Sequence, residues 1–280
     1  MSLGSVITAI VTPFDDRGRI DETAFLALFR HLVANGSEGV VVCATTGEAP
    51  TLSDEEHLRL VELACTERPG GATVIASTGS NNTAHACEMT ERATQLGADG
   101  ILSVTPYYNK PNRRGLIRHF TEISKATDKP VVLYNVPSRI GLSLDNELLA
   151  ELGQVERLDY VKQADNSALA QVDGLGLYAG TVDAFAPALD LGACGGILVA
   201  SHLAGPQMRR MVDEPQHRAE IDVQLKPLYS ALSVTTNPIP VKAALNLLGH
   251  DVGAPRLPLV EADEDELSVI RGALAEVGLR

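Results

Sequence analysis

The sequence predicts an α/β protein built as a closed (β/α)8 barrel, a TIM barrel, with a C-terminal helical extension. Eight short runs rich in β-branched residues recur along the chain, mostly about 25 to 35 residues apart. Helical patterns separate these runs, as in a parallel sheet. The length of 280 residues suits one such barrel with a small addition.

The eight predicted strands are residues 6–11, 39–43, 73–77, 100–104, 131–134, 160–162, 175–179 and 196–199. An open doubly wound sheet is the competing interpretation of this alternation. Such a sheet usually carries a Gly-rich nucleotide loop after its first strand. Residues 11–15, Val-Thr-Pro-Phe-Asp, do not resemble that loop. The pattern therefore favours the barrel.

Polar residues mark the starts of the predicted helices. Asp21, Ser53 and Thr83 precede helical patterns at 23–34, 54–66 and 84–96. Ser53 and Glu56 have the spacing of a capping box, in which each side chain satisfies a free backbone N–H group. Glycines stand where four helices should end in a left-handed conformation. They are Gly36, Gly97, Gly153 and Gly192.

Three further helical patterns follow the eighth strand, near residues 219–232, 240–248 and 263–277. No low-complexity linker separates them from the barrel. We expect residues 1–218 to form the (β/α)8 catalytic barrel and residues 219–280 to form a C-terminal helical appendage.

Composition excludes several functional classes. A formal net charge of −13 argues against a nucleic-acid or anionic-membrane partner. No apolar run reaches the length of a membrane span, and residues 1–5 contain no basic region of a secretory signal. The four cysteines have no paired short spacing, so we expect free thiols and no metal site. The sequence thus predicts a cytoplasmic location.

Lys162 is the strongest candidate for a reactive residue. It is one of six lysines and closes a predicted buried strand, where lost hydration should lower its pKa. An amine of low pKa is suited to forming a Schiff base with a carbonyl substrate. The alternative for a single lysine is a side chain that leaves the strand and snorkels into solvent.

Other polar residues lie at predicted strand ends, where barrel enzymes collect their catalytic groups. Thr45 and Thr46 offer donors for a small carboxylate, Tyr134 could transfer a proton, and Arg139 could bind a second carboxylate. Taken singly, the threonines could only form a turn, Tyr134 could only pack in the core, and Arg139 could be a solvated surface charge. Their placement on one barrel face favours an active site. Tyr108, Gly180 and Ile197 lie at the ends of other strands.

At these positions the chain resembles the dihydrodipicolinate synthase / N-acetylneuraminate lyase family of pyruvate-dependent class I aldolases. The resemblance runs from residue 7 to beyond residue 242 and so covers nearly the whole chain. The motifs that carry it are Thr45-Thr46-Gly47-Glu48, Thr105-Pro106-Tyr107-Tyr108-Asn109-Lys110-Pro111, Tyr134-Asn135-Val136-Pro137-Ser138-Arg139-Ile140-Gly141 and Asn237-Pro238-Ile239-Pro240-Val241-Lys242.

The resemblance implies a role for each candidate. Lys162 would form the imine with pyruvate, and Thr46 with Thr45 would hold the pyruvate carboxylate. Thr45, Tyr134 and Tyr108 would relay protons, with Tyr108 supplied by the neighbouring subunit of a homodimer or homotetramer. Arg139 would bind the carboxylate of L-aspartate 4-semialdehyde, with Gly180 and Ile197 lining the substrate site. The implied reaction is an early step of diaminopimelate and lysine synthesis and needs no metal or organic cofactor.

The chain departs from the family pattern beyond the sixth and seventh strands. Gln163 replaces a usual glutamate, and Thr181 stands where an aspartate is common. The segment 163–179 looks shorter than usual, so we expect a stunted sixth helix. All three departures should lie near the distal end of the substrate.

A fourth departure concerns regulation. Lysine-inhibited members pair a residue near His57 with a glutamate where this chain has His85. We therefore expect lysine inhibition to be weak or absent.

Three functions remain open from the sequence. The leading one is the condensation of pyruvate with L-aspartate 4-semialdehyde. A second is another pyruvate-dependent aldolase or dehydratase that acts on a keto-sugar acid and has a distal pocket suited to hydroxyls. A third is a binding protein without catalytic activity, suggested by the altered loops.

Overall fold

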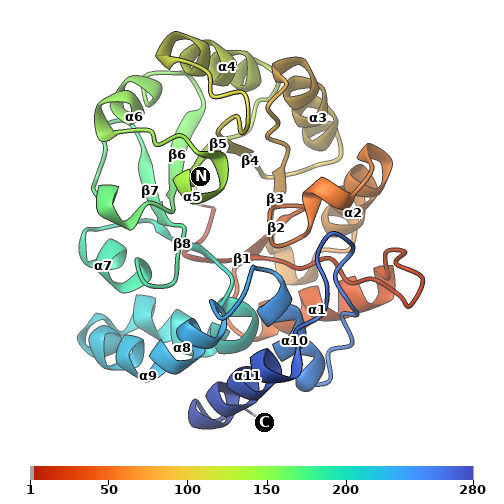
Figure 1. Ribbon diagram of the computed structural model, residues 1–280. Helices are drawn as coiled ribbons and strands as arrows, with labels where there is room; N and C mark the ends of the chain where they lie inside the picture. The colour runs from red at the N-terminus through yellow and green to blue at the C-terminus, as the bar shows by residue number, and fades with distance from the viewer. Residues whose placement is uncertain (1–2, 280) are drawn as a thin grey trace.

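The computed structural model describes residues 3–279 and shows eight parallel strands closed into a barrel (Figure 1). The strands are β1 (Val6–Ala9), β2 (Gly39–Val42), β3 (Thr73–Ser77), β4 (Gly100–Val104), β5 (Val131–Asn135), β6 (Leu158–Gln163), β7 (Gly176–Ala179) and β8 (Gly195–Leu198). Each strand pairs with the next, and β8 returns to pair with β1. The barrel prediction is confirmed, and an open sheet is excluded because closure leaves no edge strand.

Helices surround the barrel (Figure 1). They are α1 (Glu22–Ala34), α2 (Asp54–Thr66), α3 (Thr83–Gln95), α4 (Arg113–Lys125), α6 (Asn146–Leu152), α7 (Phe185–Asp190) and α8 (Ser201–Asp213). The short helix α5 (Pro137–Ile140) lies in the connection between β5 and α6, over the barrel in Figure 1. The Ser53–Glu56 capping box is confirmed. The predicted cap at Thr83 is wrong, because the Asn82 side chain accepts the free N–H groups and Thr83 is already helical.

Two hydrophobic layers hold the fold together. The inner layer fills the barrel, and the outer layer lies between strands and helices, where Phe25, Phe29 and Phe120 are fully buried. Members of the inner layer include Ile7, Ala9, Val41, Ile75, Leu102, Val132, Tyr134, Tyr178 and Ile197. Because side chains alternate along a strand, inward positions of neighbouring strands lie next to each other. Lys162 pairs in register with Tyr134 and Tyr178, so it too points inward.

The connection from β6 to β7 is short. In the described chain it contains one 3-10 turn, η3 (Asn166–Ala168), and no α-helix. The predicted stunting of the sixth helix is confirmed. Residues 172–175 form a tight turn that packs against Gly153, where an added Cβ would lie 2.7 Å from the Asp173 carbonyl oxygen. The absence of a side chain at Gly153 therefore allows the backbone of the 172–175 turn to pack closely against it.

The expected left-handed backbone at Gly153 is wrong, since its φ is −62°. Gly36, Gly97 and Gly192 do have positive φ values, of 95°, 95° and 86°. At those three helix ends the prediction is confirmed, because only glycine adopts this conformation without steric cost.

The C-terminal helices are α9 (Arg218–Ala231), α10 (Ile239–Leu247) and α11 (Glu264–Glu276). Helix α9 packs on α8, and α11 contacts both α9 and α10 (Figure 1). A helical extension is therefore present. Its division from the barrel at residues 218 and 219 stays a prediction, and α9 already begins at Arg218.

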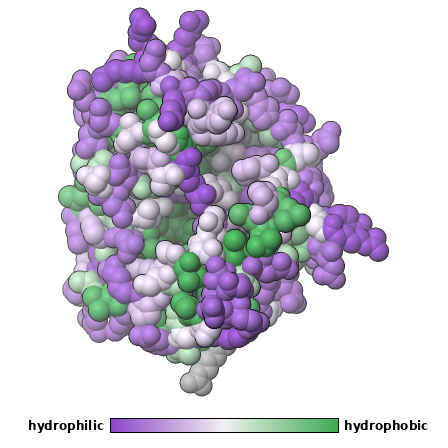
Figure 2. All heavy atoms as spheres, in the orientation of Figure 1, coloured by the Kyte–Doolittle hydropathy of each residue, from purple (hydrophilic) through white to green (hydrophobic). Residues whose placement is uncertain are grey.

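Hydrophilic residues cover much of the visible surface, and the face drawn in Figure 2 is hollowed near its centre. None of the helices within residues 3–279 has the length and apolar character needed to cross a bilayer.

Candidate active site

Lys162 lies inside the barrel near the C-terminal end of β6, and only 5% of its surface is exposed. Its Nζ atom lies 4.2 Å from the centroid of the Tyr134 ring on β5. The snorkelling alternative is therefore excluded. Burial, with the positive charge of Arg139 adding to it, lowers the pKa of the amine from 10.5 to about 7. A large neutral fraction at pH 7 makes this amine a competent nucleophile.

A cavity of about 380 Å³ opens in front of the amine. Its lining combines hydroxyl, amide, carboxylate and guanidinium groups with a few apolar side chains. The polar lining residues are Thr45, Thr46, Tyr134, Ser138, Arg139, Lys162, Asn166, Thr181, Asp183, Ser233 and Asn237. The volume and the mixed lining suit a small polar molecule.

Thr45 and Thr46 lie on the turn that follows β2. Thr46 is buried, and its Oγ1 atom accepts a hydrogen bond from Asn237 Nδ2 at 3.0 Å. The Thr45 side chain forms a hydrogen bond with Tyr134. Both hydroxyls thus lie beside the Lys162 cavity, where they can bind a carboxylate or pass a proton.

Tyr134 and Arg139 come from β5 and from the short helix α5. Burial raises the pKa of Tyr134, while the Arg139 charge and the Thr45 hydrogen bond act in the opposite direction. The Arg139 side chain is exposed at the cavity mouth, and one of its N–H groups lies 3.4 Å from the Asn237 carbonyl oxygen. Its remaining donors can bind a carboxylate that enters from solvent.

Sequence reasoning missed Asn237 as a site residue. Its side chain donates to Thr46, and its backbone carbonyl accepts from Arg139, so one residue contacts both expected carboxylate-binding groups. Asn237 precedes α10 and is far from the barrel strands in sequence. Its place in a recognisable motif was the only signal available.

Gln163 does not line the cavity in front of Lys162, contrary to expectation. It is 1% exposed, and its Oε1 atom accepts from Asn135 Nδ2 and from the Asp165 N–H group, both at 3.0 Å. Neighbouring residues on a strand face opposite ways, so Gln163 points away from the cavity when Lys162 points inward. The altered residue that does line this cavity is Thr181. Its Oγ1 atom donates to Asn166 Oδ1 at 2.7 Å, and Asn166, within the short segment 163–179, also lines the cavity.

Two other predicted residues lie outside this cavity. Ile197 is fully buried in the barrel interior, and Val199 lines the cavity in its place. Tyr108 is 90% exposed, with a positive φ of 70°. Gly180 does line the cavity, where an added Cβ would lie 2.8 Å from the Gln163 carbonyl oxygen.

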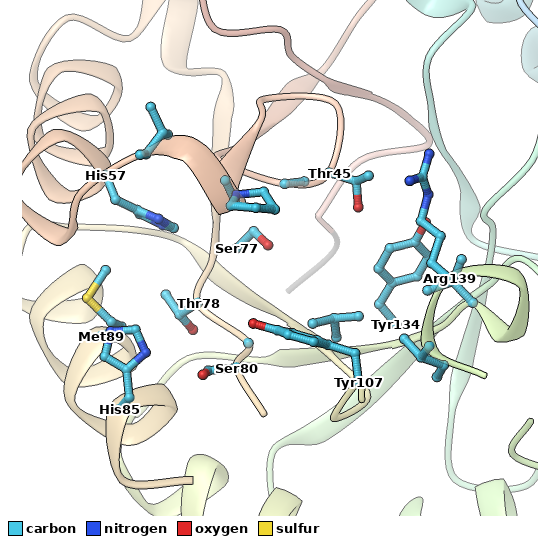
Figure 3. Close-up of a pocket in the computed structure, with 18 of the residues that line it drawn as sticks. Thr45, His57, Ser77, Thr78, Ser80, His85, Met89, Tyr107, Tyr134 and Arg139 are labelled. Carbon is cyan, nitrogen blue, oxygen red and sulfur yellow. The ribbon is translucent and has the colours of Figure 1, made fainter. Parts of the chain in front are cut away.

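A second cavity of about 360 Å³ shares Thr45, Tyr134 and Arg139 with the first, and Lys162 is not among the residues that line it (Figure 3). His57 and His85 line its far end. Burial lowers the pKa of His57 to about 4. His85 Nε2 lies 3.0 Å from the Asp54 carboxylate, so an acidic group is present in this cavity.

Fold and site together define a class of protein. The protein is a (β/α)8 barrel with a buried amine of lowered pKa at a strand end, next to a phenol and hydroxyl groups. These are the functional groups that a class I aldolase uses. Within that class, the Dihydrodipicolinate synthetase family model matches residues 2–277. The chain belongs to this family.

Individual relatives agree with the family match. The 4-hydroxy-tetrahydrodipicolinate synthase of Synechococcus sp. (strain JA-2-3B'a(2-13)) is 42% identical over 291 residues, covering 100% of this chain and 95% of that protein. A dihydrodipicolinate synthase from Acinetobacter baumannii complexed with pyruvate has a TM-score of 0.95 at 32% identity, covering 99% of this chain and 100% of that chain. The DHDPS from Cyanidioschyzon merolae with lysine bound has a TM-score of 0.95 at 37% identity, covering 99% of each.

Proposed function

We propose that this protein is a lyase that condenses pyruvate with L-aspartate 4-semialdehyde to give 4-hydroxy-tetrahydrodipicolinate, in lysine and diaminopimelate biosynthesis. The observation that carries the proposal is the buried Lys162 amine, with a pKa of about 7, at the base of a polar cavity. Membership of the family and the names of its full-length relatives support the choice of substrates.

The reaction begins when Lys162 Nζ attacks the keto carbon of pyruvate. The carbonyl oxygen leaves as water, and a C=N iminium bond replaces the C=O bond. Thr45 and Thr46 hold the pyruvate carboxylate with hydroxyl and backbone N–H donors. Tyr134 delivers the protons that the departing oxygen requires, since a phenol both donates and accepts.

The iminium then acts as an electron sink. A proton leaves the pyruvate methyl group, and the resulting enamine carbon bonds to the aldehyde carbon, whose oxygen takes up a proton. The amine of the second substrate then attacks the imine carbon, closes the ring and releases Lys162. One water molecule is released overall, so the reaction consumes no oxidant or reductant.

The Lys162 cavity also contains groups that suit the second substrate. Arg139 binds its carboxylate with a fork of N–H donors at the cavity mouth. Asp183 lines the same cavity and can face the ammonium group, although in the free protein it pairs with Lys226 at 3.3 Å.

A keto-sugar acid is the second candidate substrate class. Ser138, Thr181 and Ser233 line the Lys162 cavity and could bind sugar hydroxyl groups. Relative values of kcat/KM for aspartate semialdehyde, N-acetylneuraminate and 2-keto-3-deoxygluconate decide between the two classes. We expect turnover with the semialdehyde; preference for a sugar acid would overturn this assignment.

Borohydride reduction in the presence of pyruvate tests the catalytic proposal itself. The expected result is a mass increase on Lys162 from the reduced imine. No mass increase would support a binding protein without catalytic activity.

The active form is proposed to be at least a homodimer, and by family resemblance a homotetramer. The exposed phenol of Tyr108 stands away from its own cavity, so it would complete the proton relay of the partner subunit. A cytoplasmic location fits the negative charge and the biosynthetic role.

A further inference from the structure

Glu48 and Lys242 form an ion pair that is closed off from solvent. Lys242 Nζ lies 2.6 Å from Glu48 Oε1, and each side chain is 1% exposed. The two residues are 194 positions apart, one on the loop after β2 and the other on α10. Neither charge is needed for the proposed chemistry, so their burial requires another explanation.

Both carboxylate oxygens of Glu48 and two of the three N–H groups of Lys242 have hydrogen-bond partners. Glu48 Oε2 accepts from the Arg256 backbone N–H at 2.8 Å, and Lys242 Nζ also donates to the Ala254 carbonyl oxygen at 3.1 Å. The ammonium group lies 4.3 Å from the centroid of the Phe14 ring. Because hydrogen bonds are directional, these contacts hold the pair in one geometry, which an apolar contact of equal area would not impose.

The pair adjoins the loop that carries Thr45 and Thr46. Glu48 follows Gly47 directly, and its N–H group donates to the Thr45 carbonyl oxygen at 3.1 Å. Cys43 and Glu48, which bracket the loop, have positive φ values of 56° and 57°, a conformation that such residues rarely adopt. The turn thus depends on outside contacts to keep its shape.

Helix α10 and the segment just before it supply two of those contacts. Asn237, just before α10, donates to Thr46 Oγ1, and Lys242, within α10, binds Glu48. Thr12 adds a third contact, because its Oγ1 donates to the Gly47 carbonyl oxygen at 2.7 Å. The C-terminal extension therefore contacts the turn at its middle, through Thr46, and at its C-terminal end, through Glu48.

We propose that Glu48 and Lys242 are a positioning pair that holds the turn of residues 45–47 so that Thr45 and Thr46 face the pyruvate carboxylate. The inference rests on the proposed function, since it assigns pyruvate to those threonines. Misplacing the threonines weakens pyruvate capture, whereas the aldehyde subsite at Arg139 stays intact.

The test compares three variants, E48D, K242M and the double variant E48Q/K242M, with the control R218M. Removing one partner leaves a buried charge unpaired, so K242M should fold least well and the double variant better. Arg218 is a buried cation that binds Asp190 and the Met211 carbonyl oxygen, and it does not line the Lys162 cavity. R218M therefore reports the effect of destabilisation alone.

The main measurement is the pyruvate concentration that half-saturates borohydride trapping on Lys162. We expect it to rise about ten-fold or more in K242M and in E48Q/K242M, and about three-fold in E48D, while the KM for the aldehyde at saturating pyruvate changes less than about two-fold. In R218M the melting temperature should fall without a change in pyruvate half-saturation.

Two results would overturn the inference: unchanged pyruvate half-saturation in folded variants, or failure of all three to fold, which would make the pair a requirement for folding alone. If the unaltered protein traps no pyruvate, the proposed function fails instead, so the two failures are distinguishable.

Discussion

Lys162 Nζ lies over the ring of Tyr134, 4.2 Å from its centroid, because the two residues are register partners on β6 and β5. This contact places the proposed nucleophile against the proposed proton donor without any loop movement. The ring also shields the amine from water, and burial is the main cause of its lowered pKa.

Imine formation should depend on pH through Lys162. Only the neutral amine attacks a carbonyl, so the trapping rate at low pyruvate should rise with pH around a midpoint of about 7. Arg139→Ala removes a positive charge that lowers this pKa, and the midpoint should move to higher pH. A midpoint near 10 in the unaltered protein would contradict the buried environment of the amine.

Lys162→Met should abolish activity and stabilise the fold. The pKa of Lys162 is about 7 in the folded state, against 10.5 ordinarily, so the unfolded chain binds more protons between these values. Burial of the amine therefore destabilises the protein most at pH 7 and below, and this effect fades as pH rises towards 10.5.

The gain in stability can be followed by thermal melting. Each kcal/mol recovered corresponds to roughly 2–4 °C in a chain of this size. The control is Lys125→Met, because that side chain is 62% exposed and should give little change. A variant at Lys162 that melts lower than the unaltered protein at pH 7 would count against the assigned pKa direction.

Arg139→Ala should damage use of the aldehyde far more than imine formation. Loss of a charge-assisted contact to a carboxylate costs about 1.5–3 kcal/mol, or roughly ten- to a hundred-fold in kcat/KM for the aldehyde. Trapping of pyruvate at pH 9 should change little. Arg210→Ala, an exposed arginine on α8, serves as the control. Equal losses in both steps would refute the carboxylate-binding role.

Subunit mixing tests whether Tyr108 acts across an interface. Expressed alone, Lys162→Met should be inactive and Tyr108→Phe should be poorly active. Co-expression should form mixed dimers with one site that contains both native residues. Random pairing then restores about a quarter of the native sites. If activity stays at the sum of the two variants, Tyr108 does not act in trans.

Lysine should inhibit weakly or not at all. Asp54 supplies a carboxylate in the second cavity, but His85 occupies it through a 3.0 Å contact. An effector ammonium group would have to displace that partner. His85→Glu frees Asp54 and adds a second carboxylate, so inhibition should appear or strengthen. Micromolar inhibition of the unaltered protein in a steady-state titration would disprove the expectation.

Strand order, the helix caps at Asp21 and Ser53 and the position of Lys162 could be predicted, since they depend on residues close in sequence. The direction of Gln163 could also have been inferred, because alternation along β6 requires it to face away from Lys162. Gln163 is itself a departure from the family pattern, and that departure suggested a place near the distal end of the substrate instead. The structure shows that Asn135 binds it outside the cavity.

The sequence by itself determined the barrel, its reactive face and the amine at the end of the sixth strand, because hydrophobic periodicity is a local property of the chain. Only the tertiary structure decided which distant groups complete the site. Asn237 meets Thr46 across 191 positions, and Lys242 meets Glu48 across 194. Such contacts form when the barrel closes and the C-terminal helices pack against it. No local sequence pattern predicts which of these distant residues will be in contact.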